Sequence, residues 1–327
     1  MAEDKSSRKP MMPGRTSHSI TRRTAVSSLS LLAGAGFLPR TALAQSDATV
    51  RRFKVGECEI IVLSDGAIEL PPSVMLPGRE LVSIEQVFAA AGQKFSVLRS
   101  EVNVAVIKTG AETIVVDAGA GPDFMPTLGR FQQNLEAAGI KPEAVTKVLF
   151  THAHPDHLWG VVDPLGGDTM FEKAEHFMAT AEFEYWIQPD VDTRVPEAFR
   201  GMAVGTHRRL KSLAPRIKPT KPGQEIAPGI QIIDSGGHTP GHVSVLVRSG
   251  GEQLLIGSDV LTQQVISFSE PGWRWGPDMD AERAIASRRR ILEQLATERI
   301  RLLGYHLPWP GLGRVERKGN AYRFVQA

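Results

Sequence analysis

Cysteine is nearly absent from this chain, because Cys58 is the only one among 327 residues. A single cysteine excludes an internal disulfide, and we expect Cys58 to be a small buried side chain in a strand. The apolar stretch from Ala25 to Leu38 is also short. It holds 14 residues, fewer than the roughly 20 that a membrane-spanning helix needs. Removal of this stretch is therefore favoured over its retention as an anchor.

The residues around this stretch are typical of an export signal. Arg22 and Arg23 precede it, and the small-x-small sequence Ala42-Leu43-Ala44 follows it. This order predicts a twin-arginine signal peptide over residues 1–44, with cleavage near Gln45. We therefore expect a bacterial protein that the twin-arginine machinery exports, and that is periplasmic or secreted.

Positive charge is scarce once the export segment is set aside. The first 44 residues contain seven Lys/Arg and two Asp/Glu, which leaves 31 basic and 34 acidic residues in the rest of the chain. A formal net charge of −3 does not indicate a basic groove for phosphate backbones. We therefore expect no nucleic-acid partner, and a nuclease or phosphodiesterase is disfavoured.

Residues 45–327 contain no Ser/Gly linker, charge block or repeat, which favours a single domain. Turn residues are dense over 215–229 and predict a joint between two halves of one fold. Strand runs followed by helices, twice over, predict helices packed outside two sheets. The expected strands are 59–63, 102–107, 113–116, 147–151, 230–233, 243–247, 253–256 and 301–304, and the expected helices are 127–138, 180–187 (with Thr180 as N-cap), 197–213 and 281–297.

Histidine is scarce, with nine in the chain, but three of them fall within the six residues His152-Ala-His154-Pro-Asp156-His157. An apolar strand precedes this sequence, so its C-terminal edge would present the imidazole and carboxylate ligands that zinc prefers. Four such side chains in one tight turn can hardly face a single ion. Two metal ions are therefore the first hypothesis, and a chance cluster of surface histidines is the disfavoured alternative.

Three later segments supply further candidate ligands. Asp234-Ser-Gly-Gly-His-Thr-Pro-Gly-His242 follows a predicted strand, and its glycines allow a sharp turn that presents His238 as a third ligand for the first ion. His242 begins the next strand, which favours an orienting or structural role over metal binding. Two other predicted strands end in Asp259, which could bridge two ions, and in His306, which could complete the second site.

In identity and order, these motifs resemble those of the metallo-β-lactamase-fold hydrolases. The resemblance covers roughly residues 50–327 and implies an α/β fold of the four-layer αββα type, with two mixed β-sheets and helices on their outer faces. It also implies that Asp259 bridges the two metal ions and that Asp117 supports the site from outside the ligand set; an ordinary turn is the alternative for Asp117. The implied ligands are His152, His154 and His238 for one ion, and Asp156, His157 and His306 for the other.

Within that superfamily, the chain is most similar to methyl parathion hydrolase and its lactonase and arylesterase relatives. Two sites depart from methyl parathion hydrolase: Met75 stands where an arginine is expected, and Thr262 and Gln263 replace aliphatic residues after the bridging aspartate. These departures weigh against phosphotriester hydrolysis. The matching segments are Leu63–Gly66, Pro126–Arg130, Gly237–His242, His306–Gly313 and Tyr322–Phe324.

The resemblance implies hydrolysis by a hydroxide that two divalent ions share, with zinc as the first choice and manganese, iron or cobalt as alternatives. Asp156 and Asp259 are the candidate catalytic residues, because their carboxylates could orient the hydroxide. A lactone or aryl ester is the favoured substrate, an organophosphate triester is the alternative, and a β-lactam is less favoured. A flavin-linked diiron oxidoreductase would need Glu in place of His154, and a non-catalytic metal-binding protein is disfavoured because no predicted ligand is missing.

Aromatic residues close to the metal-bearing segments predict an apolar substrate pocket. Only Arg274 places a positive charge among them. We expect about two of five rings to contact substrate and the others to belong to the core. The expected partner is a small apolar ester, lactone or triester, and a homodimer is the candidate assembly. The candidate pocket residues are Trp159, Phe268, Trp273 and Trp309, with Trp275 as the fifth ring.

Overall fold

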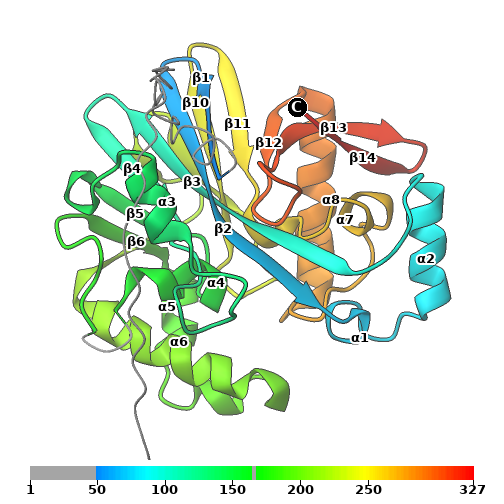
Figure 1. Cartoon of the computed structure of the whole chain (residues 1–327), viewed down its shortest axis with the longest axis horizontal. Helices are drawn as coiled ribbons and strands as arrows, with labels where there is room; N and C mark the ends of the chain where they lie inside the picture. The colour runs from blue at the N-terminus through cyan, green and yellow to red at the C-terminus, as the bar shows by residue number, and fades with distance from the viewer. Residues whose placement is uncertain (1–48, 164–166) are drawn as a thin grey trace, which may run out of the picture. The chain divides into compact units, whose positions relative to one another are not determined.

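Two β-sheets pack face to face in the computed structural model, which describes residues 49–163 and 167–327 (Figure 1). In the first sheet the strands β1 to β7 are neighbours in chain order, and in the second they follow the order β14 to β8. Both sheets are mixed, since β4 pairs with β5 and β11 with β12 in parallel while the hairpins are antiparallel. The predicted signal peptide at 1–44 lies outside the described residues, so export stays a prediction.

The strands of the two sheets differ in length from three to thirteen residues. The first sheet contains β1 (Val50–Val55), β2 (Cys58–Leu70), β3 (Leu98–Thr109), β4 (Glu112–Val116), β5 (Lys147–Phe150), β6 (Glu175–Ala179) and β7 (Ile217–Thr220). The second contains β8 (Glu225–Ala227), β9 (Ile230–Asp234), β10 (Val243–Ser249), β11 (Glu252–Ile256), β12 (Arg301–Leu303), β13 (Leu312–Lys318) and β14 (Ala321–Gln326).

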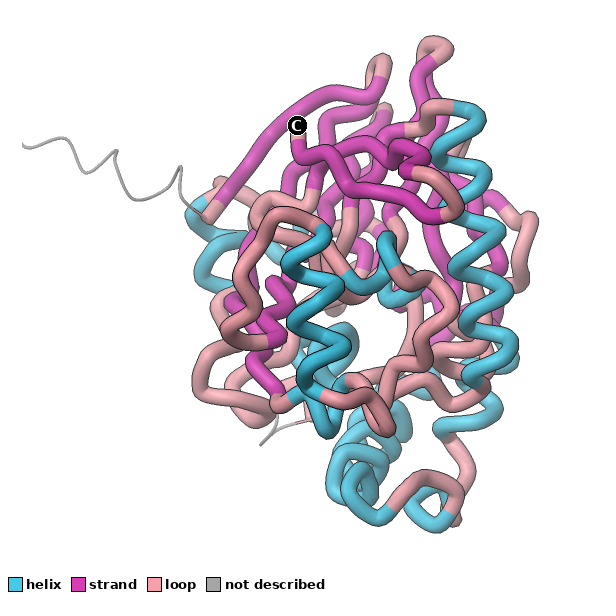
Figure 2. Tube along the Cα trace, turned by 90° about the vertical axis from the view of Figure 1, so that its right-hand side faces the viewer, coloured by secondary structure: helices cyan, strands magenta, loops and turns pink. Residues whose placement is uncertain are grey.

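Helices cover the outer face of each sheet, as Figures 1 and 2 show. α3 (Phe131–Ala137), α4 (Pro155–Leu158), α5 (Thr180–Trp186) and α6 (Arg200–Leu213) lie against the first sheet, and α7 (Ile266–Ser269) and α8 (Ala281–Glu298) against the second. In the described part of the chain, no helix combines the length and the hydropathy needed to cross a membrane. The other helices are α1 (Pro72–Met75), α2 (Leu81–Ala90) and the 3₁₀ turns η1 (Pro142–Ala144), η2 (Trp159–Val161), η3 (Val191–Thr193), η4 (Glu197–Phe199), η5 (Ala214–Arg216) and η6 (Ser258–Val260).

The four layers follow from the alternation of side chains along buried strands. In β2, Ile61 and Leu63 pack under the helices of the first sheet, whereas Ile60 and Val62 pack between the two sheets. Successive side chains of a strand point to opposite faces, and a strand buried on both faces is apolar throughout. The predicted αββα sandwich of two mixed sheets is therefore confirmed.

The predicted joint at 215–229 contains the crossing from one sheet to the other. β7 is the last strand of the first sheet and β8 begins the second, so only residues 221–224 connect them. Gly223, at φ +87°, donates its amide to the carbonyl of Ile232 across this turn. Glycine is suited to this backbone conformation, which other residues rarely adopt.

Two predicted helices begin differently from what the sequence pattern indicates. The helix expected from residue 127 begins only at Phe131, because Gly129 turns at φ +88° and the Asp65 carboxylate accepts the amide of Phe131 at 2.7 Å. Thr180 was expected to be the N-cap of α5, but Ala179 holds that position and the Thr180 hydroxyl donates to the carbonyl of Thr220. A tertiary hydrogen bond decides each boundary.

Candidate metal centre

The seven predicted ligands come from the ends of strands in both sheets. β5 leads into His152 and His154, and Pro155 at the first position of α4 turns the chain so that Asp156 and His157 lie in the helix. Proline is well suited to the first helical turn, where its missing amide hydrogen is not needed. The second sheet contributes His238 from the β9–β10 loop, Asp259 from η6 after β11, and His306 after β12.

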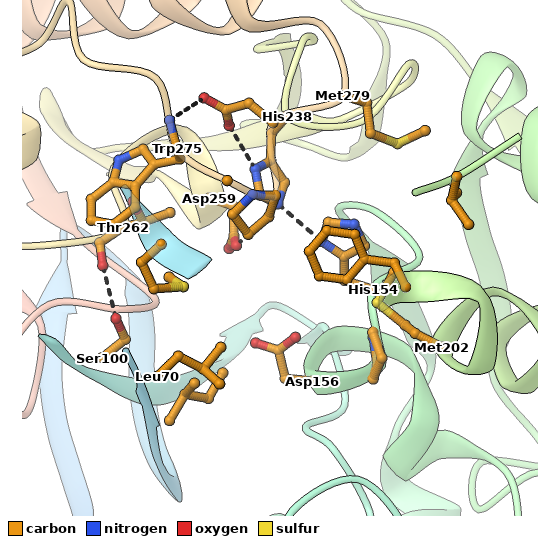
Figure 3. A pocket seen from close by; sticks show the side chains of 18 of the residues that line it. Leu70, Ser100, His154, Asp156, Met202, His238, Asp259, Thr262, Trp275 and Met279 are labelled. Carbon is orange, nitrogen blue, oxygen red and sulfur yellow. Dashed lines mark hydrogen bonds and ion pairs between the residues drawn. The ribbon is translucent and has the colours of Figure 1, made fainter. Parts of the chain in front are cut away.

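These side chains form two adjacent groups. The carboxylate of Asp259 lies between the groups, with Oδ1 at 3.0 Å from His157 Nε2 and Oδ2 at 3.3 Å from His238 Nε2. All seven side chains are buried, and Figure 3 labels His154, Asp156, His238 and Asp259 at the pocket. Within each group, one ligand atom from every residue lies within 4.8 Å of the others; the groups are His152, His154, His238 and Asp259, and Asp156, His157 and His306.

The donor set fits divalent metal ions of the zinc type. Four buried ligand atoms make no hydrogen bond of acceptable geometry: His152 Nε2, Asp156 Oδ2, His157 Nε2 and Asp259 Oδ1. Three of them lie close together, since His157 Nε2 is 3.0 Å from Asp259 Oδ1 and 3.4 Å from Asp156 Oδ2. A buried polar atom without a partner lowers the stability of the fold by about 1–3 kcal/mol. Four such atoms in one cluster would therefore be strongly destabilising unless a bound group satisfied them. Imidazole nitrogen and carboxylate oxygen are the ligands of zinc sites, so bound cations would satisfy these atoms.

The charges of the cluster also favour a cation. Burial, followed by the effect of His238, lowers the pKa of His154 to about 3, so its ring is neutral and offers a lone pair. Burial would also lower the pKa of His306, but the neighbouring carboxylates of Asp259 and Asp156 outweigh it and raise that pKa to about 10. Without a metal ion, the His306 ring therefore keeps a proton that these carboxylates stabilise. A metal ion would replace such protons on binding.

Hydrogen bonds from outside the ligand set orient the imidazoles. The Asp117 carboxylate lies 2.8 Å from His157 Nδ1 and accepts the Thr151 amide at 2.7 Å. His242 uses both ring nitrogens within the protein, since Nδ1 lies 2.8 Å from the Ser235 hydroxyl and Nε2 accepts the Asp259 amide at 3.1 Å. These contacts leave His242 outside the two ligand groups, and its predicted orienting role stays a prediction.

Two residues beside the candidate ligands, Asp117 and Ser258, have a strained backbone conformation. Asp117 has φ +64° and Ser258 has φ +48°, a region that non-glycine residues seldom adopt. Both residues follow a strand that ends at the metal centre, and the Ser258 hydroxyl lies 2.8 Å from the Thr151 hydroxyl. Strain of this kind persists only where surrounding contacts hold it, and it concentrates at functional sites.

Sequence reasoning missed two buried carboxylates that organise the centre. Asp278 lies 3.0 Å from His238 Nδ1, although 40 residues separate them. Glu182, on α5, accepts the Ala153 amide at 2.9 Å and the Gly241 amide at 2.9 Å, and so joins the two histidine-bearing loops. Neither carboxylate belongs to a motif with recognisable spacing, so no signal in the sequence could have identified them.

A largely apolar cavity adjoins the metal centre. His154, Asp156, His238, Asp259 and His306 form part of its wall. Figure 3 shows Leu70, Met202, Met279 and Trp275 around the same space. The aromatic residues of the wall are Phe124, Trp186, Phe199 and Trp275, and its other large apolar residues are Ile68, Leu70, Met75, Val195, Met202 and Met279.

None of the four aromatic residues predicted for the pocket lines this cavity. Trp159 packs beneath α6, with its Nε1 donating to Thr206 at 3.0 Å, and Phe268 is buried against Phe324. Trp273 lies under the Arg79 guanidinium at 4.4 Å, and Trp309 packs against the core between the sheets. Nearness in sequence to a metal ligand does not determine which way a ring points. Trp275, two residues from Trp273, does line the cavity.

Comparisons of sequence place the chain among known proteins. Residues 98–300 match the family model of the metallo-beta-lactamase superfamily. An N-acyl homoserine lactonase from Bacillus sp is 24% identical over 170 residues, which are 50% of this chain and 57% of that protein. Metallo-beta-lactamase domain-containing protein 1 from Xenopus laevis is 27% identical over 187 residues, which are 56% of this chain and 63% of that protein. The chain thus spans less than two thirds of the length of these curated relatives.

Solved structures resemble the chain over a larger part of its length. AidC, a dizinc quorum-quenching lactonase in complex with a product N-hexnoyl-L-homoserine, is 28% identical and has a TM-score of 0.80, covering 85% of this chain and 97% of its own. The hydrolase AbOPH of the beta lactamase superfamily is 26% identical with a TM-score of 0.78 and the same coverage. Because the family model also matches more than half of the sequence, this chain belongs to the metallo-beta-lactamase superfamily.

Proposed function

We propose that this protein is a metal-dependent hydrolase that cleaves lactones or aryl esters at a centre of two divalent ions, with zinc as the first choice. The observation that carries the proposal is the position of the two ligand groups on the wall of a largely apolar cavity. An apolar pocket with a few convergent polar groups suits a small uncharged substrate. The similarity to a dizinc lactonase supports this choice.

The chain's own residues have distinct roles in this proposal. His152, His154 and His238 would hold one ion and the second group would hold the other, with Asp259 in reach of both. Bound ions of this kind lower the pKa of water to about 7 and polarise a carbonyl oxygen. Asp156 and Asp259 line the cavity, and in this proposal their carboxylates would accept hydrogen bonds from an attacking water.

The apolar wall would orient the organic part of the substrate and exclude bulk water. Met75 belongs to this wall and adds no charge to it, whereas Arg194 and Arg274 bring positive charge to other parts of the wall. A neutral acyl or aryl group can fill the apolar space beside the candidate ligands. An organophosphate triester has the same general shape and remains the alternative substrate, which the experiment below includes.

A hydrolysis panel on protein of known metal content tests the proposed function. Zinc-loaded protein is expected to hydrolyse dihydrocoumarin and p-nitrophenyl acetate, to lose this activity on chelation, and to regain it when zinc is restored. Paraoxon and nitrocefin in the same panel distinguish the triesterase and β-lactamase alternatives. A folded protein with two metal ions that cleaves neither the lactone nor the aryl ester would refute the assignment.

Substitution of an aromatic residue that lines the cavity is expected to weaken substrate binding, whereas substitution of an aromatic residue outside the cavity is not. Phe199→Ala removes a half-buried ring from the cavity wall and should raise KM for aryl esters about tenfold, the equivalent of about 1.4 kcal/mol of lost apolar contact. Phe53→Ala is the matched control, because this half-buried ring of β1 lies outside the cavity, and should leave KM within about twofold. If steady-state kinetics showed a larger rise in KM for the control than for Phe199→Ala, the substrate would not bind in this cavity.

A further inference from the structure

Arg288 is a buried cation that no part of the proposed chemistry uses. It projects from α8 and is 1% exposed. Its guanidinium donates to three backbone carbonyls, those of Val260 at 3.1 Å, Pro271 at 3.2 Å and Trp273 at 2.9 Å. A buried guanidinium is stable only when its donors are paired, and removal of such a group typically costs several kcal/mol. Arg288 therefore holds these loops in a specific arrangement.

The remaining partner of Arg288 is the Asp278 carboxylate, at 3.1 Å. Asp278 is 2% exposed, and its other oxygen lies 3.0 Å from Nδ1 of the candidate ligand His238. The carboxylate also accepts the Trp275 amide at 3.2 Å. The interactions of His238 and Trp275 can be followed in Figure 3. One carboxylate thus contacts both a candidate metal ligand and the backbone of the cavity wall.

Residues 271–279, here called the cavity segment, supply one side of the cavity. Trp275, Pro277 and Met279 of this segment line it. The segment has little regular structure of its own, and the Met279 amide donates to the carbonyl of His238 at 3.1 Å. Its position therefore depends on Arg288, on Asp278 and on the loop that carries His238.

We propose that Asp278 and Arg288 are positioning residues that couple the candidate ligand His238 to the cavity segment, so that metal binding orders the substrate-binding wall. A cation held at His238 Nε2 would keep Nδ1 directed at Asp278, and Asp278 in turn holds the Trp275 amide and Arg288. Coupling of this kind is reciprocal, so loosening the segment weakens metal binding. The inference rests on the proposed metal site but on no particular substrate.

The Arg288 guanidinium also contacts the segment that carries the candidate ligand Asp259. Its bond to the Val260 carbonyl holds the residue directly after Asp259. Asp259 is the carboxylate that contacts both ligand groups. Loss of Arg288 should therefore disturb the metal centre through two routes, His238 and Asp259, as well as the cavity wall.

Hydrogen exchange of the full protein, read by mass spectrometry with and without zinc, tests this coupling directly. Zinc is expected to slow amide exchange over residues 271–279 in the wild-type protein. In Arg288→Met this slowing should be lost, the zinc affinity measured by chelator competition should fall about 10- to 100-fold, and KM should rise. Arg208→Met is the matched control: Arg208 is an exposed arginine on α6 that does not line the cavity, and this variant should behave as wild type.

A second variant keeps the test decisive if Arg288→Met does not fold. Asp278→Asn preserves the volume of the side chain but removes the charge that pairs with Arg288, and should reduce both zinc affinity and the zinc-dependent protection. Equal exchange over 271–279 with and without zinc, or wild-type zinc affinity in Asp278→Asn, would overturn the proposal. Neither measurement needs turnover, so a chain that couples zinc to the segment but hydrolyses no ester would refute only the proposed function.

Discussion

Replacing Asp259 by Asn is expected to reduce kcat/KM by more than about 100-fold, because even residues outside a ligand set cost about 10- to 100-fold when they are lost. Asp259 is within 3.0 Å of His157 Nε2 and 3.3 Å of His238 Nε2, so one carboxylate reaches both groups. An amide keeps the shape but offers one neutral oxygen and a nitrogen that donates. We therefore also expect the bound metal to fall from two ions per chain toward one, as measured by elemental analysis.

The control for this substitution is Asp168→Asn, which removes the same charge from an exposed position outside the cavity. Its metal content and kinetics should equal those of the wild-type protein. An Asp259→Asn protein that retains two ions and its full activity would show that the bridging assignment is wrong. Loss of activity with retained metal would instead limit Asp259 to orienting the water.

Replacing Glu182 by Gln is expected to lower the free energy of unfolding by about 2–4 kcal/mol, although the two side chains have nearly the same shape. All four partners of this buried carboxylate are donors: the amides of Ala153 and Gly241, the Thr239 hydroxyl and the Trp186 indole. The amide group of Gln would present its own donor to two of them. Because Ala153 lies between His152 and His154, zinc affinity should fall as well.

Chemical denaturation and chelator competition measure these two effects. Glu184→Gln supplies the control on the same helix, because the Glu184 side chain is exposed. It should change the unfolding free energy by no more than about 0.5 kcal/mol. If Glu182→Gln were as stable as the control and bound zinc equally well, Glu182 would only fill space, and its hydrogen bonds would not hold the histidine loops.

Much of the fold could be predicted because the signals were local. The continuous apolar sequence Ile60 to Leu63 indicates a strand buried on both faces, and the structure places alternate residues in two different cores. The turn residues at 221–224 mark the crossing between the sheets. Helix starts were predicted less well, since Phe131 begins α3 through a bond to Asp65, 66 residues away.

The candidate ligands could also be predicted from local sequence, because each follows a strand that the sequence pattern predicts. His152, His154, Asp156 and His157 share one turn, and His238 lies in a glycine-rich loop. The residues that line the cavity could not be predicted from local sequence. Trp273 and Trp275 are two residues apart, yet only Trp275 lines the cavity. The direction of a ring in an irregular loop depends on which distant segments pack against it.

The sequence by itself indicated eight of the fourteen strands that the described residues form, the candidate metal-binding side chains and the family, because each of these depends on residue type and spacing along the chain. The tertiary structure alone decided which side chains line the cavity and which buried charged residues contact the candidate ligands. Glu182, Asp278 and Arg288 have partners between 3 and 59 residues away. Their roles follow from desolvation, since a buried charge must find partners wherever the fold brings donors and acceptors together.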